Sequence, residues 1–337
     1  MQPRKRSRFA RLGLAAALVT VSAALLAAET PRIQVVPDDV AARVDVTIDG
    51  KPFTSYIYPR ELKKPVLHPL RTAKGTVVTR GFPPDPKAGE RTDHPHHVGV
   101  WFNHGDVNGL DFWNNSTDIA PEKAAKYGTI VHRRVIEAIS GKDRGELTVE
   151  MDWVDPAGTP LLKEQTHFIF RGAADGRSID RVTRLTALKQ RVVFRDNKEG
   201  VLGIRVARAL EHPAKDAADV TGNYTSSEGL TGEKVWGTRG RWTMLTGTVA
   251  AEPVTLAILD HPGNPGFPTY WHARGYGLFA ANMLGQKVFS EGKEELNLTI
   301  EPGASVVFRH RILIHGGAAK PEAIEEEYRA FTQKTMP

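Results

Sequence analysis

The segment Leu147–Trp153 reads LTVEMDW and alternates strictly between apolar and polar residues. A period of two places its apolar side chains on one face, as in a half-buried β-strand. Leu296–Ile300 alternates in the same way, and the segment 308–314 repeats an apolar or histidine residue at every second position. These three segments predict a β-rich fold.

Working outward from them, many other short segments have strand character and are separated by turn signals such as Asp49-Gly50 and Pro302-Gly303. Closely spaced strands of this kind predict an all-β fold, a large antiparallel β-sandwich or barrel, rather than alternating strands and helices. The further expected strands are Arg43–Ile48, Thr54–Tyr58, Thr76–Arg80, Val98–Phe102, Thr129–Glu137, Leu162–Phe170, Ile179–Leu185, Gly200–Ala207, Arg241–Gly247, Val254–Leu259 and Tyr276–Asn282.

Helical patterns are scarce. Pro321–Gln333 predicts a short C-terminal helix, because Pro321 suits the first helical position and Ile324, Tyr328 and Phe331 share one face. Asp118–Tyr127 indicates a second short helix, and His212–Gly240 reads as one long polar loop. Since no low-complexity linker interrupts residues 29–337, we expect them to form a single β-rich domain.

Residues 1–28 have the pattern of a removable signal peptide. Five Lys or Arg residues are followed by an uncharged run from Leu12 to Ala28, with small residues at Ala27 and Ala28. The alternative is a retained anchor, for which this run of about 17 residues lies at the lower limit. We therefore expect an exported protein, periplasmic or secreted, without stable membrane insertion after cleavage.

Charge and cysteine content exclude several functions. The formal net charge is +6, but five positive charges and no acids lie in residues 1–28, so the remainder carries about +1. That balance predicts no nucleic-acid partner. The chain has no cysteine, which excludes disulfides, thiol catalysis and cysteine-ligated metals. Without G-x-G-x-x-G after a strand, no nicotinamide or flavin cofactor is expected; HExxH and a nucleophile elbow are also missing.

The densest polar cluster is Asp93–Asp106, DHPHHVGVWFNHGD, in which four of the twelve histidines lie within eleven residues. Histidine exchanges protons and binds metals near neutral pH. In an extended segment His94 and His96 would face the same side, where they could hold a divalent metal ion or act on a sugar. The predicted catalytic residues are therefore His94, His96, His97 and His104, with His94 and His96 as possible metal ligands.

The neighbouring residues have weaker signals. Asp106 is a candidate for substrate binding or for shaping a turn. Trp101 and Trp113 are more typical of core residues than of sugar-stacking platforms.

A second cluster runs from Asp260 to Tyr276 in a Gly/Pro-rich connection. Loops on a rigid sheet scaffold often carry binding residues. The predicted substrate-binding residues here are His261, Asn264, His272 and Arg274, and Arg80 joins them from an earlier segment. Glu164, Glu228 and His68 are isolated further candidates.

These clusters resemble a domain-of-unknown-function family that carries the label "methane oxygenase PmoA". The resemblance covers most of residues 29–337. The pieces that carry it are His68–Thr72, Val78–Arg80, Asp93–His97, Gly99–Phe102, Gly105–Gly109, Asp111–Trp113, Asn223-Tyr224, Ser227–Gly229, Trp236-Gly237, Asp260–Asn264 and Tyr276-Gly277. The chain has no apolar span after Ala28, so it does not match a multi-span methane monooxygenase subunit.

The resemblance implies an exported protein with a supersandwich like that of galactose mutarotases and related lyases. Mutarotase-type chemistry needs an acid and a base across the sugar ring, and the histidine would be His96 or His97. No carboxylate partner is identifiable; Glu164 and Glu228 are only candidates.

Three hypotheses follow. The first is an exported carbohydrate-active protein that binds a small-molecule or oligosaccharide substrate and performs acid–base chemistry of epimerase, lyase or hydrolase type. The second is a metal-dependent enzyme, including the oxygenase of the family label. The third is a non-catalytic glycan-binding module.

Overall fold

The computed structural model describes residues 32–212 and 219–333, and Pro31–Pro337 forms one compact unit. The predicted signal peptide, residues 1–28, lies outside the described residues. No helix within the described ranges has the length and apolar character needed to cross a membrane.

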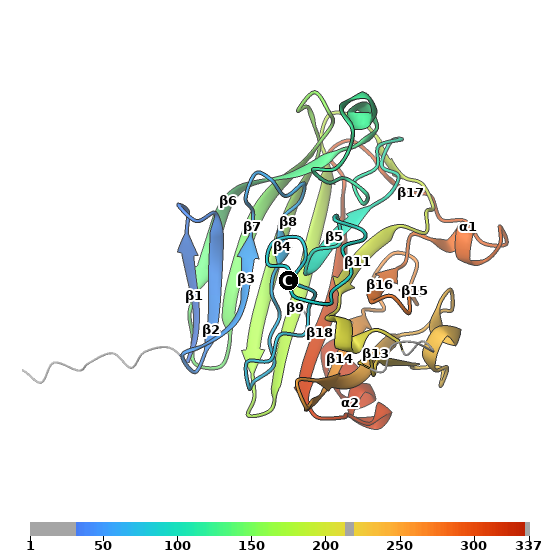
Figure 1. Ribbon diagram of the computed structural model, residues 1–337. Helices are drawn as coiled ribbons and strands as arrows, with labels where there is room; N and C mark the ends of the chain where they lie inside the picture. Colours follow the sequence, from blue (N-terminus) through green and yellow to red (C-terminus); the bar gives the residue numbers. More distant parts are fainter. Residues whose placement is uncertain (1–31, 213–218, 334–337) are drawn as a thin grey trace, which may run out of the picture. The chain divides into compact units, whose positions relative to one another are not determined.

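Two antiparallel eight-stranded sheets make up most of this unit (Figure 1). The first sheet has the order β1 (Ile33–Asp38), β2 (Arg43–Ile48), β3 (Lys51–Ile57), β4 (Val66–Leu67), β5 (Val100–His104), β11 (Gly200–Arg205), β16 (Leu278–Asn282) and β15 (Tyr270–Ala273). The second has the order β12 (Asn223–Ser226), β13 (Trp242–Val249), β14 (Glu252–Asp260), β18 (Ser305–Gly316), β9 (Gly176–Ala187), β8 (Pro160–Gly172), β7 (Gly145–Val154) and β6 (Thr129–Ile139). The predicted all-β sandwich is confirmed.

The remaining elements are short. A two-stranded ladder joins β10 (Val192–Phe194) to β17 (Leu298–Ile300). The helices are α1 (Gln286–Phe289), α2 (Pro321–Gln333) and the 3₁₀ turns η1 (Pro121–Lys126), η2 (Arg208–Leu210) and η3 (Gly232–Val235).

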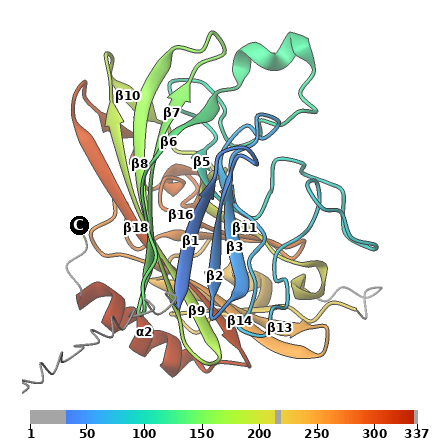
Figure 2. The same cartoon turned by 90° about the vertical axis from the view of Figure 1, so that its left-hand side faces the viewer.

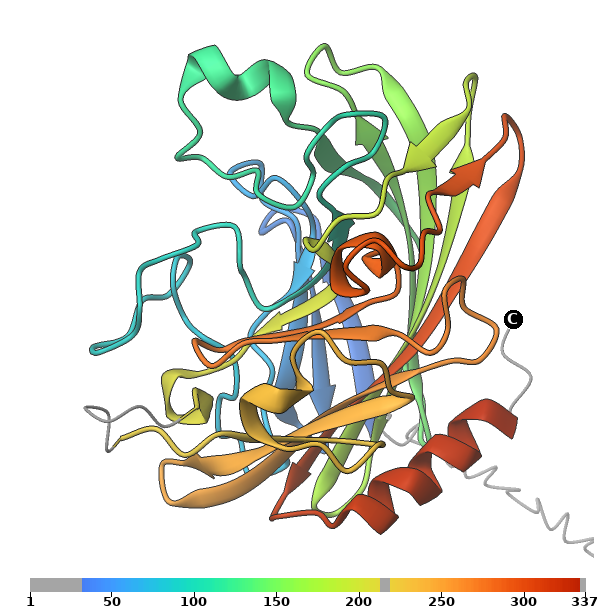
Figure 3. The same cartoon turned by 90° about the vertical axis from the view of Figure 1, so that its right-hand side faces the viewer.

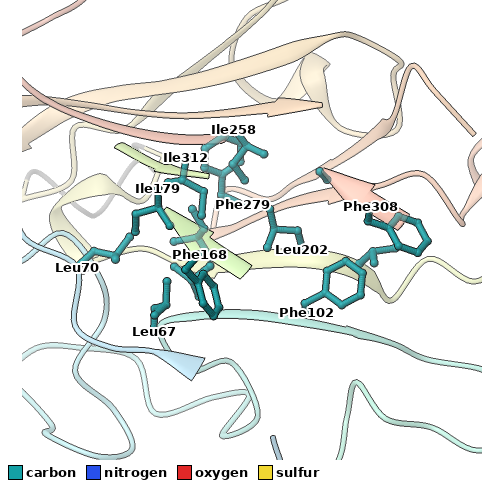
Figure 4. Packing of buried hydrophobic residues seen from close by; sticks show 14 of the residues in the cluster. Leu67, Leu70, Phe102, Phe168, Ile179, Leu202, Ile258, Phe279, Phe308 and Ile312 are labelled. Carbon is teal, nitrogen blue, oxygen red and sulfur yellow. The ribbon is translucent and has the colours of Figure 1, made fainter. Parts of the chain in front are cut away.

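The main core lies between the two sheets, where strands β1–β3 run alongside β6–β9 (Figure 2). Phe102 and Leu202 of the first sheet meet Phe168 and Phe308 of the second, as the close view in Figure 4 shows. The Phe102 and Phe308 rings lie 5.4 Å apart. Burying each such side chain contributes about 1.5–3 kcal/mol to stability, so this layer fixes the positions of the strands.

Helix α2 covers the outer face of the second sheet (Figure 3). Its buried side chains are Ile324, Tyr328 and Phe331, and they pack against β13, β14 and β18. The predicted helix and its apolar face are therefore confirmed.

The outer face of the first sheet carries a second apolar cluster that includes Trp101, Trp113 and Leu278. The strand register places Trp101, Gly203, Ala280 and His272 in one row across β5, β11, β16 and β15. Residues paired across strands face the same side, so this row lies on the outer face. A side chain at Gly203 would overlap the Trp101 indole, and glycine leaves room for that ring to lie flat.

Three expectations from the sequence are wrong in detail. Thr76–Arg80 forms only isolated bridges, to Arg71 and Val206, and no continuous ladder. The helix expected over Asp118–Tyr127 is the 3₁₀ turn η1. The expected loop His212–Gly240 contains strand β12 and turn η3, and its residues 213–218 lie outside the described ranges.

Candidate functional site

The segment Asp93–His97, the histidine loop, forms a turn and not a strand. His94 has a φ of 47°, and the His97 N–H donates to the His94 carbonyl at 2.9 Å. The expectation that His94 and His96 face the same side of an extended segment is therefore wrong, because the turn rotates successive side chains differently. Their rings lie 5.6 Å apart at 72°, whereas His94 and His97 are parallel at 4.9 Å.

Arg80 organises the histidine loop from beneath. It is 1% exposed and donates to the carbonyl oxygens of Asp93, His94 and His97 at 2.8, 2.9 and 3.0 Å. It also reaches the carbonyl of Arg91 at 3.2 Å and the Asp93 carboxylate at 3.0 Å. A planar guanidinium can serve several fixed acceptors at once, so Arg80 is a positioning residue for the loop.

Arg205 joins the histidine loop to strand β11. It is fully buried, and its Nη2 donates to Asp93 Oδ1 at 2.7 Å while its Nη1 lies 3.2 Å from His97 Nδ1. Because a guanidinium has only donors, His97 Nδ1 must accept this bond. The His97 proton then lies on Nε2, which is buried and has no hydrogen-bond partner among the described residues.

Four aromatic rings form a column on the outer face of the first sheet. The order is Tyr276, His94, His97 and Trp101, with centroid separations of 5.1, 4.9 and 5.0 Å and interplanar angles of 3°, 5° and 18°. Trp101 and His97 are buried, whereas the His94 side chain is 40% exposed. The column therefore runs from the interior to the surface, and His94 is the histidine that an external ligand can reach.

His94 lies beside a carboxylate. Its Nδ1 is 3.2 Å from Asp93 Oδ2, but the two groups are not aligned for a hydrogen bond, and this nitrogen is buried without a hydrogen-bond partner among the described residues. Burial lowers the pKa of His94 although Asp93 opposes this, which favours the neutral ring. Burial alone would raise the pKa of Asp93, but Arg205, His94 and Arg80 lower it below its usual value. A neutral imidazole carries its proton on one ring nitrogen, so the other nitrogen is available as a base.

Arg274 extends the column outward. Its guanidinium lies 5.8 Å from the Tyr276 ring and 5.1 Å from the ring of Trp236, which is 44% exposed. Cation–π contacts of this kind hold charged and aromatic planes side by side. Beyond them, His272 on β15 lies 5.9 Å from the ring of Phe289.

Glu199 is a carboxylate close enough to Tyr276 and Arg274 to interact with both electrostatically. Its side chain is 20% exposed, and burial raises its pKa, although Lys198 at 3.6 Å lowers it in part. Burial raises the pKa of Tyr276 as well, and the charge of Glu199 raises it further. A carboxyl group whose pKa is raised by burial is a candidate acid.

Lys64 stands on the other side of the histidine loop. It is 4% exposed, its Nζ donates to the His96 carbonyl at 2.8 Å, and it lies 5.7 Å from the Trp101 ring. Burial lowers its pKa to about 7. Together with His96, Lys64 lines a small cavity of about 40 Å³.

Replacing Lys64 with methionine should raise the free energy of unfolding at pH 6 by about 1–3 kcal/mol, because a buried charge is costly. The Lys64 pKa is lower in the folded chain than in the unfolded chain, so wild-type stability rises as pH rises from about 7 toward 10.5. The difference in free energy of unfolding between the variant and the wild type should therefore shrink as pH rises over that range. Urea unfolding at pH 6, 8 and 9.5 measures it; a gap that is independent of pH would contradict the assignment.

The buried histidines make the protein sensitive to acid. Burial lowers the pKa values of His68, His104, His132 and His272 to about 4, and that of His96 well below its usual value. Each must be neutral in the folded chain, so its contribution is complete above about pH 6.5 and is lost as pH falls toward 4. We expect stability to fall by roughly 1 kcal/mol per pH unit for each such histidine.

Asp260 opposes this trend, because burial raises its pKa to about 7 and it favours folding as pH falls. The histidines outnumber it, so the urea midpoint should drop steeply between pH 6.5 and 5. A flat profile there would show that folding does not lower the pKa values of these histidines.

The structure brings together only part of the predicted site. The histidine loop contains His94, His96 and His97, and Arg80 supports it. Arg274 contacts Tyr276 at the outer end of the aromatic column, and His272 lies two residues before it on β15. His104 is fully buried, and its Nε2–H donates to the Arg195 carbonyl at 2.7 Å. It lies on the opposite face of β5 from Trp101 and faces the core, where it contacts Phe194.

Three other predicted residues lie elsewhere. Asp106 accepts the Gly109 N–H at 2.9 Å, as a turn-shaping residue does. Asn264 connects Asp260 to β18. Its side-chain amide donates to Asp260 Oδ1 and to the Arg309 carbonyl, and its Oδ1 accepts the Arg309 N–H, each at 2.7 Å. His261 lies against Phe331 of α2, with ring centroids 5.4 Å apart.

The weaker candidates make the following contacts outside the histidine loop. Glu164 is buried in the main sandwich, where Trp153 and Arg181 both donate to it at 2.7 Å. Glu228 is exposed and accepts from Ser227. His68 is buried, and Gly99 approaches its Cβ closely.

The metal hypothesis for His94 and His96 finds no third ligand. No group of three or more His, Asp and Glu side chains in the described ranges is arranged to hold a metal ion. Asp93 is engaged by Arg80 and Arg205. We therefore assign no metal ligand.

Sequence reasoning missed Lys64, Glu199, Arg205 and Tyr276. A lysine between apolar residues, in Lys63-Lys64-Pro65-Val66, is a weak sign of burial. Tyr276 lay in a quoted motif but was treated as part of a strand. Neither Arg205 nor Glu199 had a local signal, because each joins the site through long-range pairing.

Fold and site together define an antiparallel β-sandwich with a histidine–arginine cluster on one outer face. The chain belongs to the family of unknown function DUF6807, which it matches over residues 43–329. This confirms the expectation of a domain-of-unknown-function family, while the methane oxygenase label stays a hypothesis. No curated protein matches the chain.

Among solved structures, the chain is similar to galactose 1-epimerase from Lactobacillus acidophilus NCFM, with 11% identity and a TM-score of 0.42 over 86% of this chain and 100% of that one. A putative aldose 1-epimerase from Escherichia coli K12 gives 10% identity and a TM-score of 0.39 over 84% and 99%. The galactosidase domain of the α-galactosidase–sucrose kinase AgaSK gives 6% and 0.42, covering 84% of this chain and 42% of that chain. TM-scores below 0.5 carry no argument about the reaction.

Proposed function

We propose that this chain is an exported carbohydrate-active protein that binds a saccharide beside the histidine loop and acts on it by acid–base chemistry. His94 serves as the base and Glu199 as the acid. The observation that carries the proposal is the continuous series of planar groups from exposed Trp236 through Arg274 and Tyr276 to His94.

Such a series suits a sugar. Aromatic faces pack against the apolar face of a sugar ring, while imidazole, guanidinium and carboxyl groups bond its hydroxyls. The His94 side chain is 40% exposed, and the Asp93 carboxylate lies 3.2 Å from its Nδ1. Glu199 has a raised pKa, so acid and base are set apart by their environments. Epimerisation, elimination and hydrolysis all need this pair.

The test is a saccharide screen by saturation-transfer NMR, followed by product analysis of each saccharide that binds. We expect at least one saccharide to bind the wild type, Tyr276→Ala to lose most of the signal, and His94→Asn to bind without turnover. His261→Asn is the matched control, because His261 lies against α2. Binding that survives Tyr276→Ala, or no binding by any saccharide, would overturn the proposal.

A non-catalytic glycan-binding module shares the binding step. The two proposals differ in one result. If the protein is a non-catalytic module, the wild type binds the saccharide and the saccharide stays chemically unchanged over long incubation. In that case the acid–base part of the proposal fails and the binding part stands.

Export is supported by the pattern of residues 1–28. The mass of the protein recovered outside the cytoplasm should correspond to a chain that begins near Glu29. Full-length protein in the cytoplasmic fraction would contradict export.

A further inference from the structure

A second cavity, of about 570 Å³, opens between the loop after β3 and the beginning of β6. This volume lies within the range of small-molecule sites. The loop is fixed there, because the Ile130 N–H donates to the Lys63 carbonyl at 2.9 Å. One wall is the stacked pair Tyr58 and His132, whose rings lie 3.9 Å apart at 27°. A wall of stacked rings offers a flat surface to a sugar-sized molecule.

The charges that line this cavity are all positive. They belong to Arg60, Lys64 and Arg133, and no Asp or Glu lies among the lining residues. Arg133 is paired with Asp152 at 2.7 Å outside the lining. No ion pair or side-chain hydrogen bond engages the Arg60 guanidinium in the part of the chain that the structure describes. Outside the lining, Asp39 accepts from the Tyr58 hydroxyl at 3.3 Å. Of the three cationic lining residues, Arg60 and Lys64 therefore have no anionic partner among the described residues, whereas Arg133 has one.

Lys64 forms its floor and connects it to the histidine loop. The same side chain lines the 40 Å³ cavity beside His96, and its only hydrogen-bond acceptor among the described residues is the His96 carbonyl. An ammonium has three N–H donors, so two of those on Lys64 remain without an acceptor among the described residues. His96 Nε2, on a side chain that is 9% exposed, is also without a partner.

We infer that this cavity binds the carboxylate of a sugar-sized anionic ligand, a uronic acid or an oligosaccharide that contains one, with Lys64 and Arg60 as its donors. The inference deepens the proposed function and rests on it for the sugar part of the ligand. It names the substrate class, because Lys64 holds the carbonyl of His96 in the same loop that presents His94. Lys64 costs stability where it lies, and a bound carboxylate would compensate that cost.

Other charges near Lys64 set the pH response. Asp111 raises its pKa in part, and Glu61 and Lys63 line the small cavity. Burial lowers the pKa values of His96 and His132, so both are neutral between pH 6 and 8.5. Lys64 is then the group in the cavity that loses charge over this range. Carboxylate affinity should weaken severalfold from pH 6 to pH 8.5.

The experiment compares D-glucuronate, D-galacturonate and trigalacturonate with D-glucose, D-galactose and maltotriose by calorimetry or saturation-transfer NMR. We expect at least one acid to bind about tenfold more tightly than its neutral counterpart. Lys64→Met should remove that preference, and Arg60→Met should weaken it about threefold or more. Lys293→Met is the matched control, since Lys293 is exposed and outside the cavity.

The outcomes separate the two proposals. Equal binding of acid and neutral sugars overturns the anionic site and leaves the proposed function standing. No binding by any sugar overturns both. A preference for acids that persists in Lys64→Met and Arg60→Met places the site elsewhere and also overturns the inference. Should Lys64→Met fail to fold, the pH dependence of the wild type and the Arg60→Met variant still decide.

Discussion

Replacing Arg80 with methionine will lower the free energy of unfolding by about 3–5 kcal/mol, the range for removing one partner from a buried charged network. The guanidinium is 1% exposed and serves the carbonyls of Asp93, His94 and His97. Methionine fills similar space but donates no hydrogen bond, so these carbonyls lose their partner. Urea unfolding at pH 7 measures the loss, and hydrogen exchange over residues 91–97 should increase.

Arg60→Met is the control for charge and size, because Arg60 is exposed. It should change stability by no more than about 0.5 kcal/mol. An Arg80→Met variant as stable as the wild type, with unchanged exchange in residues 91–97, would show that the histidine loop holds its shape without the guanidinium.

Replacing Glu199 with glutamine should reduce turnover of the saccharide found in the screen by about 10²–10⁴-fold, the usual contribution of a positioned acid or base. The amide keeps the size of the side chain, so saccharide affinity should change little. Burial raises the pKa of Glu199, so wild-type turnover should fall as pH rises through that pKa. This limb of the pH profile should be missing from the variant.

Glu228→Gln is the matched control, because Glu228 is an exposed carboxylate that accepts from Ser227. It should leave turnover unchanged. Equal activity of Glu199→Gln and wild type would remove Glu199 from the chemistry, and loss of binding together with turnover would make it a binding group.

The strands were the most predictable part of the fold. β7 and β2 follow from local alternation, and α2 matches its predicted bounds. The strands β4 and β10 were missed because two or three residues are too short to show a period of two. Thr76–Arg80 is rich in β-branched residues like a strand, but it forms only isolated bridges.

The site was only partly predictable. The density of histidines located the loop, but the positive φ of His94 reversed the expected side-chain directions. The sequence predicted one binding cluster over Asp260–Tyr276. In the structure Asn264 is bonded to the backbone of β18, whereas Arg274 lies against Tyr276 of the aromatic column. Arg205 and Glu199 reach the site because β11 pairs with β5, about 100 residues away in sequence. Such contacts follow from sheet topology, which the sequence pattern does not reveal.

The most direct test is hydrogen–deuterium exchange of the protein with and without the best-binding saccharide of the screen. We expect protection of residues 91–101, 197–203 and 272–277 on binding, with little change in residues 260–266 and in α2. Protection confined to residues 260–266 and α2, or a bound saccharide that protects none of the three predicted segments, would contradict this expectation.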